Sequence, residues 1–141
     1  MADLDFTTTV AIDDQHAKEM LHALPTWMAY RPEIWAHPFL LVVDNAMSVD
    51  LVEEVGAKLK HPNLKVMPAQ PWPSSSQREK MLTALTLFAP TCVQTKWLLK
   101  IDTDCIAKAY DSRWCSESIV SGDPAFISSP WNYSKPADVV Q

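Results

Sequence analysis

The sequence predicts an α/β fold of three layers, α/β/α, in which helices cover both faces of a mostly parallel β-sheet. Short apolar segments alternate along the chain with segments of helical periodicity, the pattern of parallel strands joined by crossover helices. Aspartates follow three of the apolar segments. The 141 residues, 48% of them hydrophobic, are enough for one domain with a buried core. We therefore expect a single α/β domain over residues 1–141.

The first strand is predicted at residues 6–12, where apolar residues alternate with polar or small ones. Asp13 and Asp14 end it, and Asp14 is placed to cap the helix that follows. Pro25 is expected to kink that helix or to start a second turn. The apolar stripe of the helix consists of Met20, Leu21, Leu24, Trp27 and Met28.

The second strand is predicted at residues 39–43, an unbroken apolar run typical of a strand covered on both faces. It ends at Asp44, and Ser48 is placed to cap the next helix. A shorter third strand is expected at residues 64–67, before prolines that hold the chain extended. The helix between these strands has an apolar face of Leu51, Val52, Val55 and Leu59.

The second half of the chain opens with Ser76-Gln77-Arg78-Glu79, a capping box that predicts the start of a helix. That helix is expected to end near Pro90. A fourth, buried strand is predicted at residues 97–101, and a fifth at residues 125–128. Residues 134–138 have the pattern of a helix start, with a proline early in the first turn.

Three of the predicted strands end at aspartates, namely Asp13, Asp44 and Asp102. Ligands bind at the carboxyl ends of the strands in open α/β sheets, so we expect acidic side chains to gather at one functional edge. The alternative for each aspartate is a helix cap or a turn, where this residue is common. Asp13, Asp14 and His16 also have the composition of a metal cluster, but a strand end and a helix cap explain them more simply.

The strongest candidate site is Asp102-Thr103-Asp104, directly after the fourth strand. Residues i and i+2 of an extended segment point to the same side, so both carboxylates are expected to face one site. Two carboxylates together with diphosphate oxygens suit Mg²⁺ or Mn²⁺. A second D-x-D, Asp3-Leu4-Asp5, lies in the N-terminal tail, where it carries no such expectation.

Two segments, in this order along the chain, carry a family resemblance. Leu41-Val42-Val43-Asp44-Asn45-Ala46, with Ser48 and Asp50, resembles the second strand and the V-V-D-[DN]-x-S-x-D turn of GT-A nucleotide-sugar glycosyltransferases of the family 2 type. Residues 97–104 resemble that family's hydrophobic strand and D-x-D metal motif. The resemblance covers roughly residues 6–130. It implies a GT-A-like domain that transfers a sugar from a nucleotide-diphosphate sugar to an unknown acceptor, with a metal ion.

The resemblance also implies roles for the residues at the strand ends. Ile12 and Asp13, at the end of the first strand, and Asp44 would border the base and the ribose of the nucleotide. Asp104 would coordinate the Mn²⁺ or Mg²⁺ ion that holds the diphosphate. Asp102 would lie nearer the ribose or bind the same ion.

Arg78 is a further candidate nucleotide contact, because it takes the second position of its helix, where free backbone N–H groups favour anions. Family members carry a basic residue in the matching helix, and the match is open between Arg78 and Lys80. The alternative for Arg78 is a solvated surface arginine.

The chain departs from the family after the metal motif. GT-A enzymes have a second half that binds the acceptor and carries the catalytic carboxylate, and residues 105–141 are too few for it. The C-terminal acceptor half is therefore predicted to be short or absent, and no catalytic base is assigned. A partner chain or an oligomer is expected to complete the acceptor site. Trp131 and Tyr133 are candidates for a sugar platform, or else core or surface aromatics.

Composition excludes several other classes. With only Gly56 and Gly122, neither a P-loop nor a dinucleotide-binding fingerprint can be present. The net charge of −5 argues against a nucleic-acid binder, no apolar run approaches a membrane span, and three cysteines without a C-x-x-C pair indicate free thiols in the cytoplasm. Two alternatives stay open: a nucleotide-sugar-binding module without transfer activity, and a D-x-D phosphatase with Asp102 as nucleophile.

Overall fold

The computed structural model describes residues 5–69, 76–107, 134–135 and 138–139, with the backbone alone for residues 77–78, 134–135 and 138–139. The elements, in chain order, are β1 (Phe6–Ile12), α1 (Ala17–Tyr30), α2 (Pro32–Trp35), β2 (Phe39–Val43), α3 (Val49–Leu59), β3 (Leu64–Pro68), α4 (Gln77–Thr83), the π-helix η1 (Ala84–Phe88), α5 (Ala89–Cys92), β4 (Trp97–Lys100), β5 (Ser134–Lys135) and β6 (Asp138–Val139).

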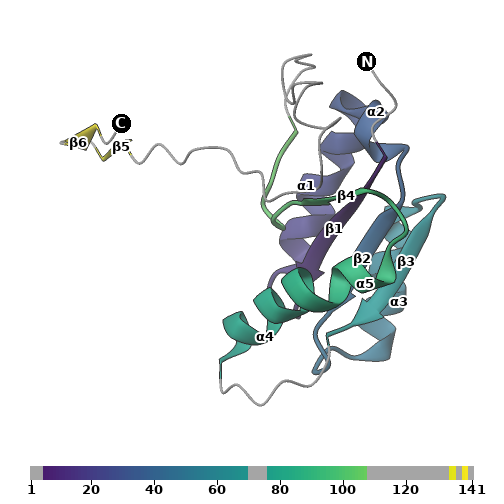
Figure 1. Ribbon diagram of the computed structural model, residues 1–141, viewed down its shortest axis with the longest axis vertical. Helices are drawn as coiled ribbons and strands as arrows, with labels where there is room; N and C mark the ends of the chain where they lie inside the picture. The colour runs from purple at the N-terminus through teal and green to yellow at the C-terminus, as the bar shows by residue number, and fades with distance from the viewer. Residues whose placement is uncertain (1–4, 70–75, 108–133, 136–137, 140–141) are drawn as a thin grey trace.

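A four-stranded sheet forms the middle of the fold (Figure 1). Its strands are all parallel and lie in the order β3-β2-β1-β4. The connections from β1 to β2 and from β2 to β3 run through helices, as parallel neighbours require. The predicted α/β class with a parallel sheet is confirmed, and the first four predicted strands all belong to that sheet.

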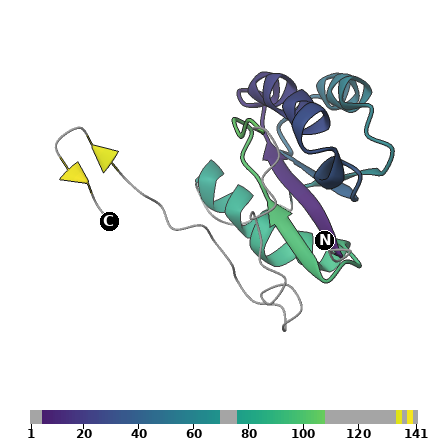
Figure 2. The same ribbon diagram turned by 90° about the horizontal axis from the view of Figure 1, so that it is seen from above.

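Helices cover both faces of the sheet, with α1 and α3 on one side and α4 to α5 on the other (Figure 2). Two clusters of buried side chains fill the spaces between the layers, so the three-layer prediction is confirmed. The buried members of the cluster under α1 and α3 are Val10, Ile12, Ala17, Met20, Leu24, Phe39, Leu41, Val43, Met47, Val55, Leu59 and Ile101. Those of the cluster under α4 to α5 are Leu40, Val42, Met67, Ala69, Ala84, Leu85 and Ala89.

Because both faces are covered, the polar residues of β1 are buried as well as its apolar ones. Thr9 has no exposed surface, and its hydroxyl donates a hydrogen bond to the carbonyl oxygen of Leu40 at 3.0 Å. A buried hydroxyl with a partner avoids most of the desolvation cost that an unsatisfied one would carry. The alternation seen in the sequence therefore does not mark a water-exposed face.

Two of the predicted helix caps are confirmed and one is wrong. The hydroxyl of Ser48 accepts from the backbone N–H of Leu51 at 3.3 Å, and that of Ser76 accepts from Glu79 at 3.1 Å. Asp14 caps nothing, because the chain makes a turn at residues 14–16 and α1 begins only at Ala17. Pro25 lies inside α1, which continues to Tyr30, and the helical stretch that begins at Gln77 ends at Cys92, near Pro90 as predicted.

The fourth strand differs from its prediction in burial and in length. Within the described residues, β4 is the edge strand of the sheet, its first three residues are half-buried and Lys100 is exposed. The strand ends at Lys100, although the N–H of Ile101 still donates to the carbonyl oxygen of Thr9 at 3.0 Å. The D-x-D motif therefore follows a half-buried edge strand.

Several predictions fall in the last third of the chain. The helix start at residues 134–138 is wrong, because Ser134–Lys135 and Asp138–Val139 pair as two short antiparallel strands. The β-branched Val139 favours this extended backbone. The fifth strand at 125–128, Trp131 and Tyr133 lie outside the described residues. Among the helices that are described, none is long and apolar enough to cross a membrane.

Candidate functional site

The carboxyl ends of β1, β2 and β4 meet at one edge of the sheet. Ile12 lies beside Val43 in the β1–β2 register, and Thr9 lies beside Lys100 in the β1–β4 register. Asp13, Asp44 and residues 101–104 therefore leave the sheet at the same edge. We call this set the carboxyl edge.

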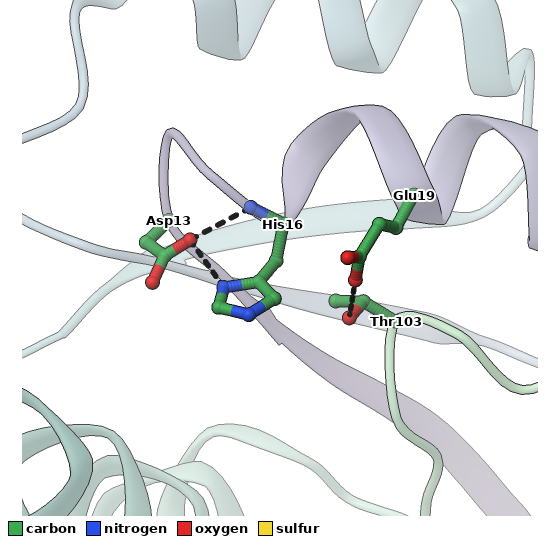
Figure 3. A network of polar contacts seen from close by, with 4 residues as sticks. All are labelled: Asp13, His16, Glu19 and Thr103. Atoms are coloured by element: carbon green, nitrogen blue, oxygen red, sulfur yellow. Dashed lines mark hydrogen bonds and ion pairs between the residues drawn. The ribbon is translucent and has the colours of Figure 1, made fainter.

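Asp13 forms a close pair with His16 at the start of α1 (Figure 3). One carboxylate oxygen, Oδ1, accepts from the backbone N–H of His16 at 2.8 Å and lies 2.6 Å from Nδ1 of the same residue. This hydrogen bond raises the pKa of His16 above its usual 6.5, against a smaller lowering by burial, and the charges of Asp13, Glu19 and Asp104 raise it further. The site therefore favours the protonated imidazole.

Asp44 forms an ion pair that is much less exposed. The ammonium of Lys80, from α4, donates to Oδ1 of Asp44 at 2.6 Å, and the exposed fractions of the two side chains are 20% and 7%. The backbone N–H of Ala46 donates to the same oxygen at 3.3 Å. Asp44 is thus a buried residue of the carboxyl edge, with the Lys80 ammonium beside it. Of the two basic candidates, Lys80 is the one seen here, since the side chain of Arg78 lies outside the described residues.

Ile12, a predicted nucleotide contact, has its side chain in the core. Its side chain belongs to the core and is 1% exposed, and its carbonyl oxygen accepts from the N–H of Asp44 at 2.9 Å. This hydrogen bond ties the end of β1 to the end of β2. The same hydrogen bond fixes the position of Asp13, the residue after Ile12, at the edge.

The D-x-D motif forms a turn rather than an extended strand end. The N–H of Cys105 donates to the carbonyl oxygen of Asp102 at 3.1 Å, which closes a turn over Thr103 and Asp104. The expectation of an extended segment is therefore wrong, and whether both carboxylates face one site stays a prediction. We call residues 102–105 the D-x-D turn.

The two carboxylates of this turn have different surroundings. Asp102 forms an ion pair with Lys100, and both side chains are exposed. Asp104 is also exposed, and its charge acts on His16. Between them Thr103 is buried, and its hydroxyl donates to the Glu19 carboxylate at 3.3 Å (Figure 3). The turn therefore presents carboxylates to solvent while its middle residue holds it against α1.

The donor set fits a divalent cation that is shared with a ligand. Among the described residues, no group of three or more His, Cys, Asp or Glu side chains could hold a metal ion by itself. Asp102 and Asp104 are two exposed carboxylates on one turn, and Mg²⁺ is commonly held by one or two carboxylates together with substrate phosphates. The residues present suit that shared arrangement, with a diphosphate providing the other oxygens.

Sequence reasoning missed two features of the carboxyl edge: the presence of Glu19, and the ion pair between Lys80 and Asp44. Glu19 reaches the edge because it lies in the first turn of α1. His16 was considered as a metal ligand and set aside. The sequence signal for this pair was the spacing of three residues between Asp13 and His16, because an aspartate near a helix start commonly accepts a hydrogen bond from the backbone N–H three residues on.

Comparisons with known proteins bear on the fold. No protein-family model matches the chain, and no curated protein matches it. Its structure is similar to the X-ray structure of the mannosyltransferase Ktr4p from S. cerevisiae, with a TM-score of 0.54 and 11% sequence identity. The match covers 72% of this chain and 32% of that chain, so this chain spans about a third of that protein's length. The chain therefore shares an α/β fold with part of a mannosyltransferase.

Proposed function

We propose that the chain binds a nucleotide-diphosphate sugar at the carboxyl edge, with Mn²⁺ or Mg²⁺, as the donor-binding part of a glycosyltransferase. The observation that carries the proposal is the meeting of Asp13, Asp44 and the D-x-D turn at one edge of a parallel sheet. In open α/β sheets this is the edge at which ligands bind. The fold shared with part of a mannosyltransferase supports sugar transfer as the reaction class.

The proposal gives each part of the edge a task. Asp13 and Asp44 border the base and the ribose, for which carboxylates are hydrogen-bond acceptors. Lys80 holds the Asp44 carboxylate in place, and the basic contact to the diphosphate is expected from Arg78 or Lys80. Asp104, with Asp102, holds the cation. A bound divalent cation neutralises the charge that develops on a leaving diphosphate.

The transfer step itself is the second part of the proposal. A transferase must also hold the acceptor in near-attack geometry and remove a proton from it. We expect that function to come from a partner chain, a second copy or further segments, and we expect the 141-residue chain alone to bind nucleotide with little or no sugar transfer. The alternative is a binding module without transfer activity.

The test is a calorimetric titration of the chain with UDP, GDP, ADP and CDP, with and without Mn²⁺. We expect at least one nucleoside diphosphate to bind, with an affinity that rises when Mn²⁺ is present. The variant Asp104→Asn should lose the effect of Mn²⁺ and stay folded, because the carboxylate is exposed. Asp3→Asn, in the other D-x-D of the chain, is the matched control and should bind as the wild type does.

Three results would contradict the proposal. Binding that does not respond to Mn²⁺, or a folded Asp104→Asn variant that responds like the wild type, would remove the cation from the site. Acid-stable phosphorylation of Asp102 after incubation with a phosphate monoester would instead assign the chain to the D-x-D phosphatases.

A further inference from the structure

Two hydrogen bonds from the far end of α1 hold the chain directly after the D-x-D motif. The indole N–H of Trp27 donates to the carbonyl oxygen of Cys105 at 2.7 Å. The hydroxyl of Thr26 accepts from the backbone N–H of Ala107 at 2.9 Å. With Thr103 bonded to Glu19 at the other end of the same helix, α1 contacts this segment at three places.

These contacts matter because the sheet does not hold this segment. The last bond from the sheet goes from the N–H of Ile101 to Thr9, and no strand follows within residues 101–107. Beyond Ile101 the turn has its own Cys105 to Asp102 hydrogen bond, which fixes its shape but not its place. The position of Asp104 relative to Asp13 is therefore set by contacts with α1.

Trp27 is suited to fix that position. Its side chain is half-buried and packs against both the cluster under α1 and the smaller cluster of Phe6 and Ile34. An indole ring wedged between two clusters has little rotational freedom, and its one polar hydrogen is aimed at the Cys105 carbonyl. Thr26 is oriented in the same way, since its hydroxyl donates to the carbonyl oxygen of Ala23 at 2.5 Å while it accepts from Ala107.

We propose that Trp27 is a positioning residue, which holds the D-x-D turn so that its carboxylates meet the cation of a bound nucleotide at the carboxyl edge. This inference rests on the proposed function. Trp27 itself touches neither nucleotide nor cation. It acts through the Cys105 carbonyl, and the loss of its N–H should affect the cation-dependent part of binding only.

The experiment compares Trp27→Phe with Trp35→Phe. Both variants replace a half-buried tryptophan that packs on the same core cluster. Trp35 contacts the rings of Phe39 and His61, and its indole N–H makes no hydrogen bond within the described residues, so it controls for the loss of packing alone. The probe is Mn²⁺ together with whichever of UDP, GDP, ADP or CDP binds best, and unfolding in urea gives the stability of each variant.

We expect Trp27→Phe to weaken Mn²⁺-dependent nucleotide binding roughly three- to tenfold, as one lost hydrogen bond allows, and to leave binding without Mn²⁺ unchanged. Trp35→Phe should change neither, at a similar loss of stability. Hydrogen exchange without any ligand gives a second measurement, in which the amides of Cys105 and Ala107 should exchange faster in Trp27→Phe only.

Should Trp27→Phe fold poorly, Thr26→Val tests the same segment with an isosteric change. Its control is Thr91→Val, which loses a similar hydroxyl-to-carbonyl bond three residues back, to Phe88. Unchanged exchange at Cys105 and Ala107, or equal Mn²⁺ dependence in both tryptophan variants, would overturn the inference while the proposed function stands. A wild-type chain that shows no effect of Mn²⁺ would overturn both.

Discussion

Two carboxylate–cation pairs lie at neighbouring strand ends, and they differ chiefly in burial. At the end of β2, Asp44 and Lys80 are 7% and 20% exposed. At the end of β1, the exposed fractions are 23% for Asp13 and 43% for His16. Coulomb attraction grows as water is excluded, but so does the cost of removing one partner. The Asp44 pair is therefore a structural part of the edge, whereas the Asp13 pair is adjustable by pH.

The largest effect should follow from breaking the buried pair. Lys80→Met removes the ammonium from a carboxylate that is 7% exposed, and we expect a loss of about 3 kcal/mol in the free energy of unfolding. Unfolding in urea measures it. The matched control is Lys58→Met, whose pair with Glu54 is more than half exposed on both sides, so that solvent screens it and its loss should hardly change the stability.

Equal losses for the two lysine variants would show that burial does not separate these pairs. The conclusion that the buried Asp44 pair is a structural part of the edge would then be wrong.

A smaller change at the same pair should act on binding. Asp44→Asn keeps the shape of the side chain but removes its charge, and we expect roughly tenfold weaker nucleoside diphosphate binding, with Mn²⁺ and without it. Binding of Mn²⁺ alone should not change. Asp50→Asn, at an exposed position in the first turn of α3, is the control. An equal loss of Mn²⁺ binding in Asp44→Asn would assign this carboxylate to the cation instead.

The smallest effect belongs to the exposed pair. Because the pKa of His16 is raised in the folded chain, its contribution to stability is present below pH 6.5 and is lost as the pH rises through the raised value. The His16 side chain is 43% exposed, so solvent screens the pair and its contribution to stability stays below about 1 kcal/mol. His16→Gln should therefore be less stable than wild type in urea at pH 6 and equal to it at pH 9. A gap that grows towards pH 9 would reverse the sign and contradict the pairing.

His61 gives the opposite sign within the same molecule. Burial lowers its pKa below 6.5, because the ring is packed against Trp35 and Phe39, and this outweighs the raising by backbone hydrogen bonds at Trp35, Asn63 and His37. Its contribution is present above pH 6.5 and is lost as the pH falls through the lowered value. A titration followed by NMR should place His16 above 6.5 and His61 below it.

Local signals in the sequence were enough for much of the fold. The apolar runs predicted four strands of the sheet, and Ser48 and Ser76 predicted two helix starts, because a cap depends on residues only three positions away. Asp14 failed as a cap for an equally local reason, since one extra turn precedes α1. The pattern could not tell that β4 lies at an edge of the sheet formed by the described strands, because edge or centre depends on the order of strands in the sheet.

The candidate site was predictable only in part. Aspartates after strands indicated the carboxyl edge, but the partners of those aspartates come from distant elements. Lys80 lies 36 positions from Asp44, and Trp27 lies 78 positions from Cys105. No spacing rule connects such pairs, so their contacts appear only when the layers are packed. The conformation of the D-x-D turn was missed because a hydrogen bond from Cys105 to Asp102 closes it, and its position was missed because that depends on contacts with α1.

The strand order also has a consequence for how the chain folds. The hydroxyl of Thr9 in β1 meets a β2 residue 31 positions away, whereas that of Thr7 meets Thr95, just before β4, 88 positions away. Closing the longer loop costs about 1 kcal/mol more entropy, and contacts between distant residues form late. β1, β2 and β3 can therefore assemble first, with β4 added at the end. The D-x-D turn, which follows β4, would then take its position after the ends of β1 and β2, with Asp13 and Asp44, are already in place.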